Sequence, residues 1–372
     1  MVIAAPSSLP GGAVGLATAG VLDLPANDSA TTRTWSNTLT GSGTVRLNVA
    51  YNAAATSTQL TGIAGFGGTV RLVATGTTLD KLAVASTLAA SSATVDVGPG
   101  TTLFNSAAAT CGAIRVSGTG NAEGRGALRV ASTLTGSVTL LGDTLASFET
   151  GAIAGTVTGG TAASIMLTLG GVGATTGTMS GIISNGSGVV SLTVAAGDVL
   201  LSGVNTYTGQ TTINAGTRIR VNADSGLGTA PATVVPNQLV IAGGTLAVLT
   251  GNQTFSANRG IAIVGSATLD TSSLSAASNN STTFSGVITG TGPLTIRANG
   301  DLSASGAGSN TYFNLNATND FVGDVTITSG LVGPLNNASL GAAGNRVILA
   351  GGGLVDPGRN VTLVRELSVQ PT

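Results

Sequence analysis

Histidine is missing from this 372-residue sequence, and cysteine occurs once, as Cys111. Without histidine the chain cannot build a Ser-His-Asp or Cys-His catalytic arrangement, and metal sites that depend on imidazole are excluded. A single cysteine permits no disulfide within the chain, so cysteine usage leaves the redox compartment open. Cys111 is interpreted as a small buried thiol rather than a nucleophile, because no histidine can activate it.

Charged and aromatic residues are also scarce, at 8% and 3% of the chain, whereas glycine occurs 57 times. The net charge of −1 offers no basic surface for nucleic acid. Disorder is not expected either, because 42% of the residues are apolar, and these are mostly small aliphatic residues that suit a long, narrow core. No apolar run reaches the roughly 18 residues of a membrane span. The N-terminus lacks the basic stretch of a secretory signal.

The strongest pattern in the sequence is an internal repeat. Asn205–Gly216 reads N-T-Y-T-G-Q-T-T-I-N-A-G, and Asn319–Gly330 reads N-D-F-V-G-D-V-T-I-T-S-G. The shared positions are Asn205, Tyr207, Gly209, Ile213 and Gly216 in the first copy and Asn319, Phe321, Gly323, Ile327 and Gly330 in the second. Matching flanks extend the better-matched copies to residues 181–246 and 286–354, while the offset between them drifts. Such drift is typical of stacked repeats with turns of variable length.

Alternation of apolar and polar residues predicts strands along the chain. In residues 44–49, Val45, Leu47 and Val49 share one face, and Arg46 and Asn48 share the other. Related strands carry an arginine between two apolar residues at Arg71, Arg115, Arg129, Arg220 and Arg297. We interpret these arginines as solubilising residues of the outer face; the alternative is a binding strip for acidic glycans.

Glycine-rich breaks separate these strands, and no segment shows the apolar spacing and end signals of a helix. A sandwich or barrel would favour more aromatic residues and more hairpin turns. Self-similarity along the chain instead favours a solenoid with coils of roughly 20–25 residues. The predicted fold is therefore all-β, a parallel β-helix (β-solenoid) with turns rich in glycine and asparagine.

The motif at residues 203–216 resembles the passenger-associated repeat of bacterial autotransporters, whose pattern runs N-T-Y-T-G-G-T-T-I-x-x-G. Residues 126–143 and 35–43 resemble other segments of such passengers, and together the matches cover most of residues 30–355. The resemblance implies a right-handed parallel β-helix exposed outside the cell, in an adhesin-like or other surface protein. Since the sequence shows neither a secretory signal nor a C-terminal anchor like that of autotransporters, we expect a piece of such a passenger or, alternatively, a phage tail fibre or spike.

Acidic residues provide the remaining candidates for chemistry. Asp320 and Asp324 lie in the second copy of the motif, where a carboxylate pair could cleave glycosides or bind calcium, although an exposed turn explains them better. Asp143, Asp198 and Asp301 each follow a glycine and are interpreted as turn residues rather than ion ligands. We therefore predict no catalytic, metal-binding or cofactor-binding residues and no cofactor.

The aromatic residues of the repeat, Tyr207 and Phe321, leave two alternatives open. We expect them to fill the core or to cover a corner of a coil; the alternative is a platform on which sugar rings stack. The asparagines of the repeat, Asn205 and Asn319, are expected to be turn residues whose amides bond along the stack of coils.

Three segments are expected along the chain: an N-terminal cap or incomplete first coil at 1–30, β-helix repeats at 31–355, and a C-terminal cap or joining segment at 356–372. The predicted function is a non-enzymatic stalk or adhesin-type surface rod, extracellular or on the cell surface. The alternative is a phage virion appendage that attaches to a host, and a polysaccharide-cleaving β-helix is the least favoured hypothesis. Expected partners are further copies of the chain, as a trimer in a virion fibre, or a cell-surface glycan or protein.

Overall fold

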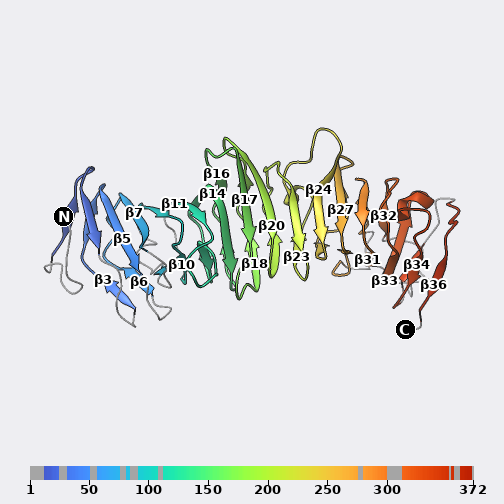
Figure 1. Ribbon diagram of the computed structural model, residues 1–372, viewed down its shortest axis with the longest axis horizontal. Helices are drawn as coiled ribbons and strands as arrows, with labels where there is room; N and C mark the ends of the chain where they lie inside the picture. Colours follow the sequence, from blue (N-terminus) through green and yellow to red (C-terminus); the bar gives the residue numbers. More distant parts are fainter. Residues whose placement is uncertain are drawn as a thin grey trace. The chain divides into compact units, whose positions relative to one another are not determined.

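The computed structural model describes residues 12–24, 32–50, 57–75, 81–83, 91–107, 112–274, 280–299, 312–351, 353–355 and 361–370. The chain divides into two compact units, Met1–Ser191 and Leu192–Thr372. Figure 1 labels many of their strands. Within the described residues the helices are two single turns of 3-10 helix, η2 (Asp224–Leu227) and η3 (Asn337–Leu340).

The first unit consists of short strands joined by turns. Its strands are β1 (Val14–Leu16), β2 (Val21–Leu24), β3 (Arg33–Trp35), β4 (Leu39–Gly41), β5 (Thr44–Ala50), β6 (Ser57–Leu60), β7 (Thr69–Thr75), β8 (Lys81–Ala83), β9 (Thr94–Val97), β10 (Leu103–Asn105), β11 (Ala113–Gly118), β12 (Leu128–Val130), β13 (Thr133–Leu134), β14 (Ser137–Phe148), β15 (Ala152–Ile153), β16 (Val157–Gly159), β17 (Ser164–Leu169), β18 (Thr176–Met179) and β19 (Ile183–Ser184). Strand β20 (Val189–Val194) includes the division between the units.

Strands of the first unit pair in parallel with strands of the next coil. One series runs β2–β5–β7–β9–β11–β14, a second runs β3–β6–β8–β10–β12, and a third runs β13–β15–β18. Strands β5 and β7 lie side by side in Figure 1. Each coil therefore completes the backbone hydrogen bonds of its neighbour, as expected for a solenoid.

Aliphatic side chains stack in register to form the core of this unit. Val45, Val70, Val95, Ile114 and Val138 are partners on successive coils, and each is at most 1% exposed. Burying a side chain of this size contributes about 1.5–3 kcal/mol. The polar residues between them face outward, so the alternation seen in the sequence separates core from surface.

The second unit repeats this plan. Its strands are β21 (Asp198–Leu201), β22 (Thr211–Asn214), β23 (Arg218–Val221), β24 (Val235–Ala242), β25 (Thr245–Val248), β26 (Gln253–Phe255), β27 (Arg259–Val264), β28 (Ala267–Asp270), β29 (Thr282–Phe284), β30 (Ile288–Thr291), β31 (Leu294–Arg297), β32 (Phe313–Leu315), β33 (Val325–Pro334), β34 (Val347–Leu349), β35 (Gly353–Val355) and β36 (Leu367–Val369). Parallel series run β21–β23–β25–β28–β31–β33–β34–β36, β22–β24–β27–β30 and β26–β29–β32–β33–β35.

Two columns of side chains fill the core of the second unit. The aliphatic column consists of fully buried register partners, namely Ile219, Leu246, Leu269, Ile296 and Ile327. A second column is aromatic, because the rings of Phe255 and Phe284 stack at 4.5 Å and those of Phe284 and Phe313 at 5.2 Å. Three of the eleven aromatic residues of the chain thus stack on one another in this column.

The expected all-β parallel β-helix is confirmed, with two differences of detail. Coils are longer than expected in places: 28 residues separate Thr211 from its partner Leu239, because η2 and the loop after it are inserted between them. Two 3-10 helices that the sequence pattern does not signal, η2 and η3, interrupt the strands, each only four residues long. No helix of the described ranges is long and apolar enough to cross a membrane.

The expected terminal segments, 1–30 and 356–372, lie partly outside the described residues. Within them, residues 12–24 contain β1 and β2, and residues 361–370 contain β36. Strand β36 pairs with β34.

Candidate functional site

The two copies of the repeat motif make similar local contacts on different strand series of the second unit: Ile213 lies in β22 and pairs with Ile241 of β24, whereas Ile327 lies in β33 and pairs with Ile296 of β31. The side-chain amide of Asn205 donates to the carbonyl of Gly226 in η2 at 2.7 Å, and that of Asn319 donates to the carbonyl of Ser339 in η3 at 2.6 Å. The side-chain oxygen of Asn319 also accepts the backbone N–H of Ile288, on the preceding coil, at 2.8 Å. Each asparagine therefore links its own coil to a 3-10 helix of the following one.

The aromatic residues of the motif, Tyr207 and Phe321, are fully buried beside these helices. Gly228 and Gly341 end the helices with a φ of 83°, and a Cβ added there would lie 2.4 Å from the carbonyl oxygen of Tyr207 and 2.6 Å from that of Phe321. Burial raises the pKa of Tyr207 to about 12, and its hydroxyl shares a 2.6 Å hydrogen bond with that of Thr211. Because both rings are buried, they do not form a platform for sugars.

The remaining motif positions are Gly209, Ile213 and Gly216 in the first copy and Gly323, Ile327 and Gly330 in the second. Both isoleucines are fully buried. The last glycine of each copy has a left-handed backbone, with φ of 72° and 70°. The first glycine of each copy bonds to the following coil: the carbonyl of Gly209 accepts from Gln238 at 2.8 Å, and the N–H of Gly323 donates to Asn345 at 2.9 Å.

The candidate carboxylate pair does not act as a unit. Asp324 accepts hydrogen bonds from the Arg346 side chain at 2.6 Å and from the Arg346 backbone N–H at 3.0 Å. These bonds and the positive charge of Arg346 hold the pKa of Asp324 below its usual value. Asp320 is exposed, and its backbone N–H donates to the carbonyl of Ile288 at 3.1 Å. The pair therefore consists of one ion-paired carboxylate and one exposed turn residue.

The other acidic candidates also have local partners. Asp143 accepts a backbone N–H of the next coil at 2.8 Å, and Asp198 accepts a hydrogen bond from Arg220 at 2.6 Å. Asp301 and Cys111 lie outside the described residues. Within the described ranges, no group of three or more acidic, cysteine or histidine side chains could hold a metal ion.

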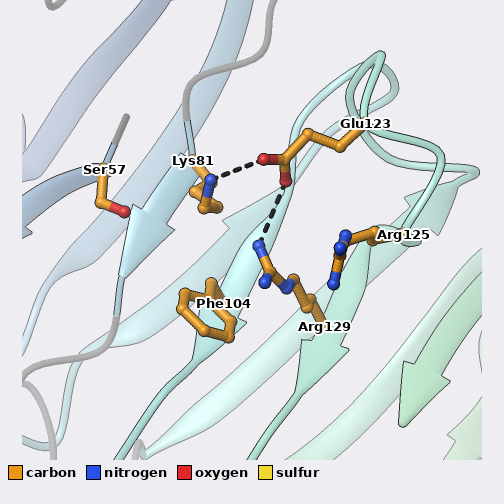
Figure 2. A pocket seen from close by; sticks show the side chains of 6 residues that line it. All are labelled: Ser57, Lys81, Phe104, Glu123, Arg125 and Arg129. Carbon is orange, nitrogen blue, oxygen red and sulfur yellow. Dashed lines mark hydrogen bonds and ion pairs between the residues drawn. The ribbon is translucent and has the colours of Figure 1, made fainter. Parts of the chain in front are cut away.

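Five charged residues of the first unit form a cluster that sequence reasoning missed: Lys81, Glu123, Arg125, Arg129 and Glu149. We call it the carboxylate-capped cluster. Glu123 accepts from Lys81 at 2.8 Å and from Arg129 at 3.3 Å, as Figure 2 shows. Glu149 accepts from Arg129 at 2.6 Å and from Arg125 at 2.5 Å. Every cation of the cluster thus has a carboxylate at hydrogen-bonding distance.

A pocket of about 350 Å³ opens at this cluster, lined by Ser57, Phe104 and four of the charged residues (Figure 2). The guanidinium carbon of Arg129 lies 4.1 Å from the centre of the Phe104 ring, a cation–π contact. Burial alone would raise the pKa of Glu149, but the hydrogen bonds and charges of Arg129 and Arg125 outweigh it, so this pKa lies below its usual value. The charged side chains of the pocket wall are thus paired with one another, which favours a structural role for the carboxylate-capped cluster.

A second group of charged residues follows one outward-facing register position across β2, β5, β7, β9 and β11. Its members are Asp23, Arg46, Arg71, Asp96 and Arg115, and we call it the arginine column. The side chains of Arg46, Arg71 and Arg115 are 43%, 58% and 50% exposed. Arg46 lies 3.2 Å from Asp23, whereas Arg71 and Arg115 lie 3.7 and 3.5 Å from the one carboxylate of Asp96.

The carboxylates of the arginine column are poorly satisfied. Oδ1 of Asp23 lies 3.2 Å from Arg46 and Oδ1 of Asp96 lies 3.5 Å from Arg115, but both oxygens are buried and neither accepts a hydrogen bond within the described structure. A shallow pocket of about 150 Å³ lies beside Arg71, Asp96 and Arg115, with Pro99 among the residues that line it. The column therefore presents guanidinium groups that the chain itself neutralises only in part.

Comparison with known proteins adds one relative to this picture. No family model and no solved structure matches the chain. The chain is similar to the adhesin BmaC autotransporter of Brucella suis biovar 1 (strain 1330), with 30% identity over 227 residues. The match covers 58% of this chain and only 6% of that relative. Fold and similarity together fit a passenger-like protein of the autotransporter type, and nothing in the comparisons supports the virion alternative.

Proposed function

We propose that this chain is a structural or adhesin-type solenoid displayed outside the cell, without catalytic activity of its own. The observation that carries the proposal is the 227-residue similarity to an autotransporter adhesin in a chain that folds as a parallel β-solenoid. Because the chain spans 6% of that relative, the activity of the whole relative is not transferred to it.

The construction of the solenoid supports this role. Coils bond to one another through parallel strands and fully buried columns such as Ile219, Leu246 and Leu269, so stability accumulates from coil to coil. Such a stack holds surface side chains at regular intervals, about 4.8 Å from one coil to the next. The partners we propose are a glycan or protein of a cell surface, or further copies of the chain.

An adhesion assay tests the proposal. Fluorescent beads coated with the full chain are incubated with cultured cells and with immobilised extracellular glycans and proteins. The control is Leu246→Asp, which places a charge in the fully buried aliphatic column and disrupts the fold. We expect the wild-type beads to adhere and the control beads to be washed away. Equal retention of both would contradict a function of the folded solenoid.

Incubation with polysaccharides separates this function from catalysis. Chain length of bacterial surface polysaccharides is followed by size-exclusion chromatography after prolonged exposure to the protein. We expect the polymers to keep their length. Shortening of any of them would show an enzyme and overturn the proposed non-catalytic role.

A further inference from the structure

The arginine column holds more arginines than aspartates to pair with them. Arg46 and Arg71 are direct register partners on adjacent parallel strands, and like charges at opposed positions of a sheet are destabilising. Each of the two also has an aspartate on its other side, Asp23 next to Arg46 and Asp96 next to Arg71. Asp96 is in turn the register partner of Arg115, so one carboxylate serves two arginines.

The acids within the column lie deeper than the arginines. The side chains of Asp23 and Asp96 are 21% and 13% exposed, less than half as much as those of the arginines they contact. The outermost layer of the column is therefore positive. Three arginines against two aspartates leave one positive charge over, on a chain whose net charge is −1.

The carboxylate of Asp96 is shared between two arginines and satisfies neither fully. Its Oδ1 lies 3.5 Å from Arg115 and its Oδ2 lies 3.7 Å from Arg71, and Oδ1 accepts no hydrogen bond within the described structure. The two guanidinium groups are 50% and 58% exposed, and a guanidinium has five N–H donors. A ligand that carries anionic groups would accept hydrogen bonds from the donors that face solvent.

We propose that the arginine column binds a linear acidic polysaccharide that runs from coil to coil across the sheet. Carboxylate or sulfate groups accept hydrogen bonds from Arg46, Arg71 and Arg115, and the polymer passes over the pocket of about 150 Å³ between Arg71 and Arg115. Sugar rings rest against the apolar surface of Pro99 beside it. This inference rests on the proposed function and names its ligand class.

Nucleic acid fits the column less well. Its phosphates would match the arginines, but the overall charge of −1 lacks the broad basic footprint of nucleic-acid-binding proteins. The carboxylate-capped cluster is a weaker candidate than the column for binding an anionic ligand, because its cations already bond to carboxylates at 2.5–3.3 Å.

Binding of the full chain to immobilised polymers tests the proposal. The probes are heparin and polygalacturonate as sulfated and carboxylated polysaccharides, dextran as a neutral one, and a single-stranded DNA oligonucleotide. We expect binding to both acidic polysaccharides, none to dextran, and an affinity that falls steeply between about 50 and about 200 mM salt. No binding to either acidic polysaccharide at low salt would overturn the proposal, as would DNA bound equally tightly.

Variants assign the binding to the column. The triple variant Arg46→Gln, Arg71→Gln and Arg115→Gln should weaken binding about tenfold or more. The matched control, Arg220→Gln, Arg297→Gln and Arg346→Gln, removes the same charge from the second unit and should change affinity less than about twofold. An equal loss in both variants would overturn the assignment.

A variant with the opposite sign guards against misfolding as an explanation. Asp23→Asn removes the carboxylate that competes for Arg46 and should strengthen binding about twofold. Unchanged or weaker binding by this variant would count against the column.

The bead assay separates this inference from the proposed function. Cell adhesion that persists in the triple arginine variant would leave the adhesin function standing and overturn the column as its ligand site. Polysaccharide binding without adhesion to any surface would support the column and contradict the adhesin function.

Discussion

The carboxylate-capped cluster and the arginine column both lie in the first unit and contain the same charges, three cations and two carboxylates. In the cluster, each cation is bonded to a carboxylate at 2.5–3.3 Å. In the column, the nearest contacts are 3.2–3.7 Å, and two arginines share one aspartate. Equal net charge therefore says little about what a surface can bind.

Burial explains the difference between the two groups. Lys81 and Glu123 expose 4% and 9% of their side chains, so an unpaired charge there would be costly and the pair must be complete. Arg71 exposes 58% of its side chain, so water solvates it and an incomplete pair costs little. We infer that the buried group contributes stability and that the exposed group remains available to a partner.

The largest expected effect is on the buried pair. Glu123→Gln removes the carboxylate that bonds to Lys81 and Arg129, and should lower the free energy of unfolding of the first unit by about 3–5 kcal/mol. The only tryptophan, Trp35, lies buried in β3 of the first unit, so its fluorescence during urea titration reports that unit. The control is Asp320→Asn at an exposed turn, which should change stability by less than about 0.5 kcal/mol.

A smaller, pH-dependent effect is expected at Glu149. Its pKa is lowered from the usual 4.5, so its contribution is complete above that pH and is lost as the pH falls through the lower pKa of the folded state. Glu149→Gln should therefore cost about 1–2 kcal/mol at neutral pH, and the difference from wild type should shrink on acidification. Urea titrations at neutral and acidic pH measure it; a difference that grows in acid would contradict the assigned sign.

The aromatic contact should contribute less. Phe104→Leu keeps an apolar side chain but removes the ring that lies 4.1 Å from the Arg129 guanidinium, and should cost about 1 kcal/mol. Phe104→Tyr, which keeps the ring face, serves as the matched control. Equal losses for both variants in the same fluorescence titration would contradict a contribution from the cation–π contact, because tyrosine keeps that contact and leucine removes it.

The smallest effect on stability is expected in the column. Arg71→Gln relieves the repulsion from Arg46 and loses one 3.7 Å contact, so stability should change by less than about 0.5 kcal/mol. A loss of more than about 1 kcal/mol in the urea titration would show that the column stabilises the fold as the cluster does. That result would contradict the distinction drawn between the two groups.

The sequence predicted the fold well because period-two alternation and repetition are local signals. Val45, Val70 and Val95 could be assigned to one core face from their neighbours alone, and the structure stacks them. The outward position of Arg46 and Arg71 followed from the same alternation. The coil between Thr211 and Leu239 is longer than expected because it contains an insertion, and the period-two alternation of the strands gives no signal of such an insertion.

The features that could not be predicted from the sequence, the charged cluster and the 3-10 helices, depend on contacts between coils. Glu123 lies 42 residues from Lys81, and Glu149 lies 20 from Arg129, so the cluster exists only because coil lengths bring these residues together. The 3-10 helices are four residues long, too short for an apolar period, and the asparagines that anchor them bond 20 or 21 residues ahead. Such distances are set by the register of the stack, which the sequence pattern leaves open.

Arginine-specific labelling with phenylglyoxal, mapped by mass spectrometry with and without heparin, tests the contrast between the two groups most directly. We expect Arg46, Arg71 and Arg115 to react in the free protein and to be protected by heparin, while Arg129, 14% exposed and bonded to two glutamates, stays unlabelled in both samples. Protection centred on Arg125 and Arg129, or no protection at the column, would contradict the account.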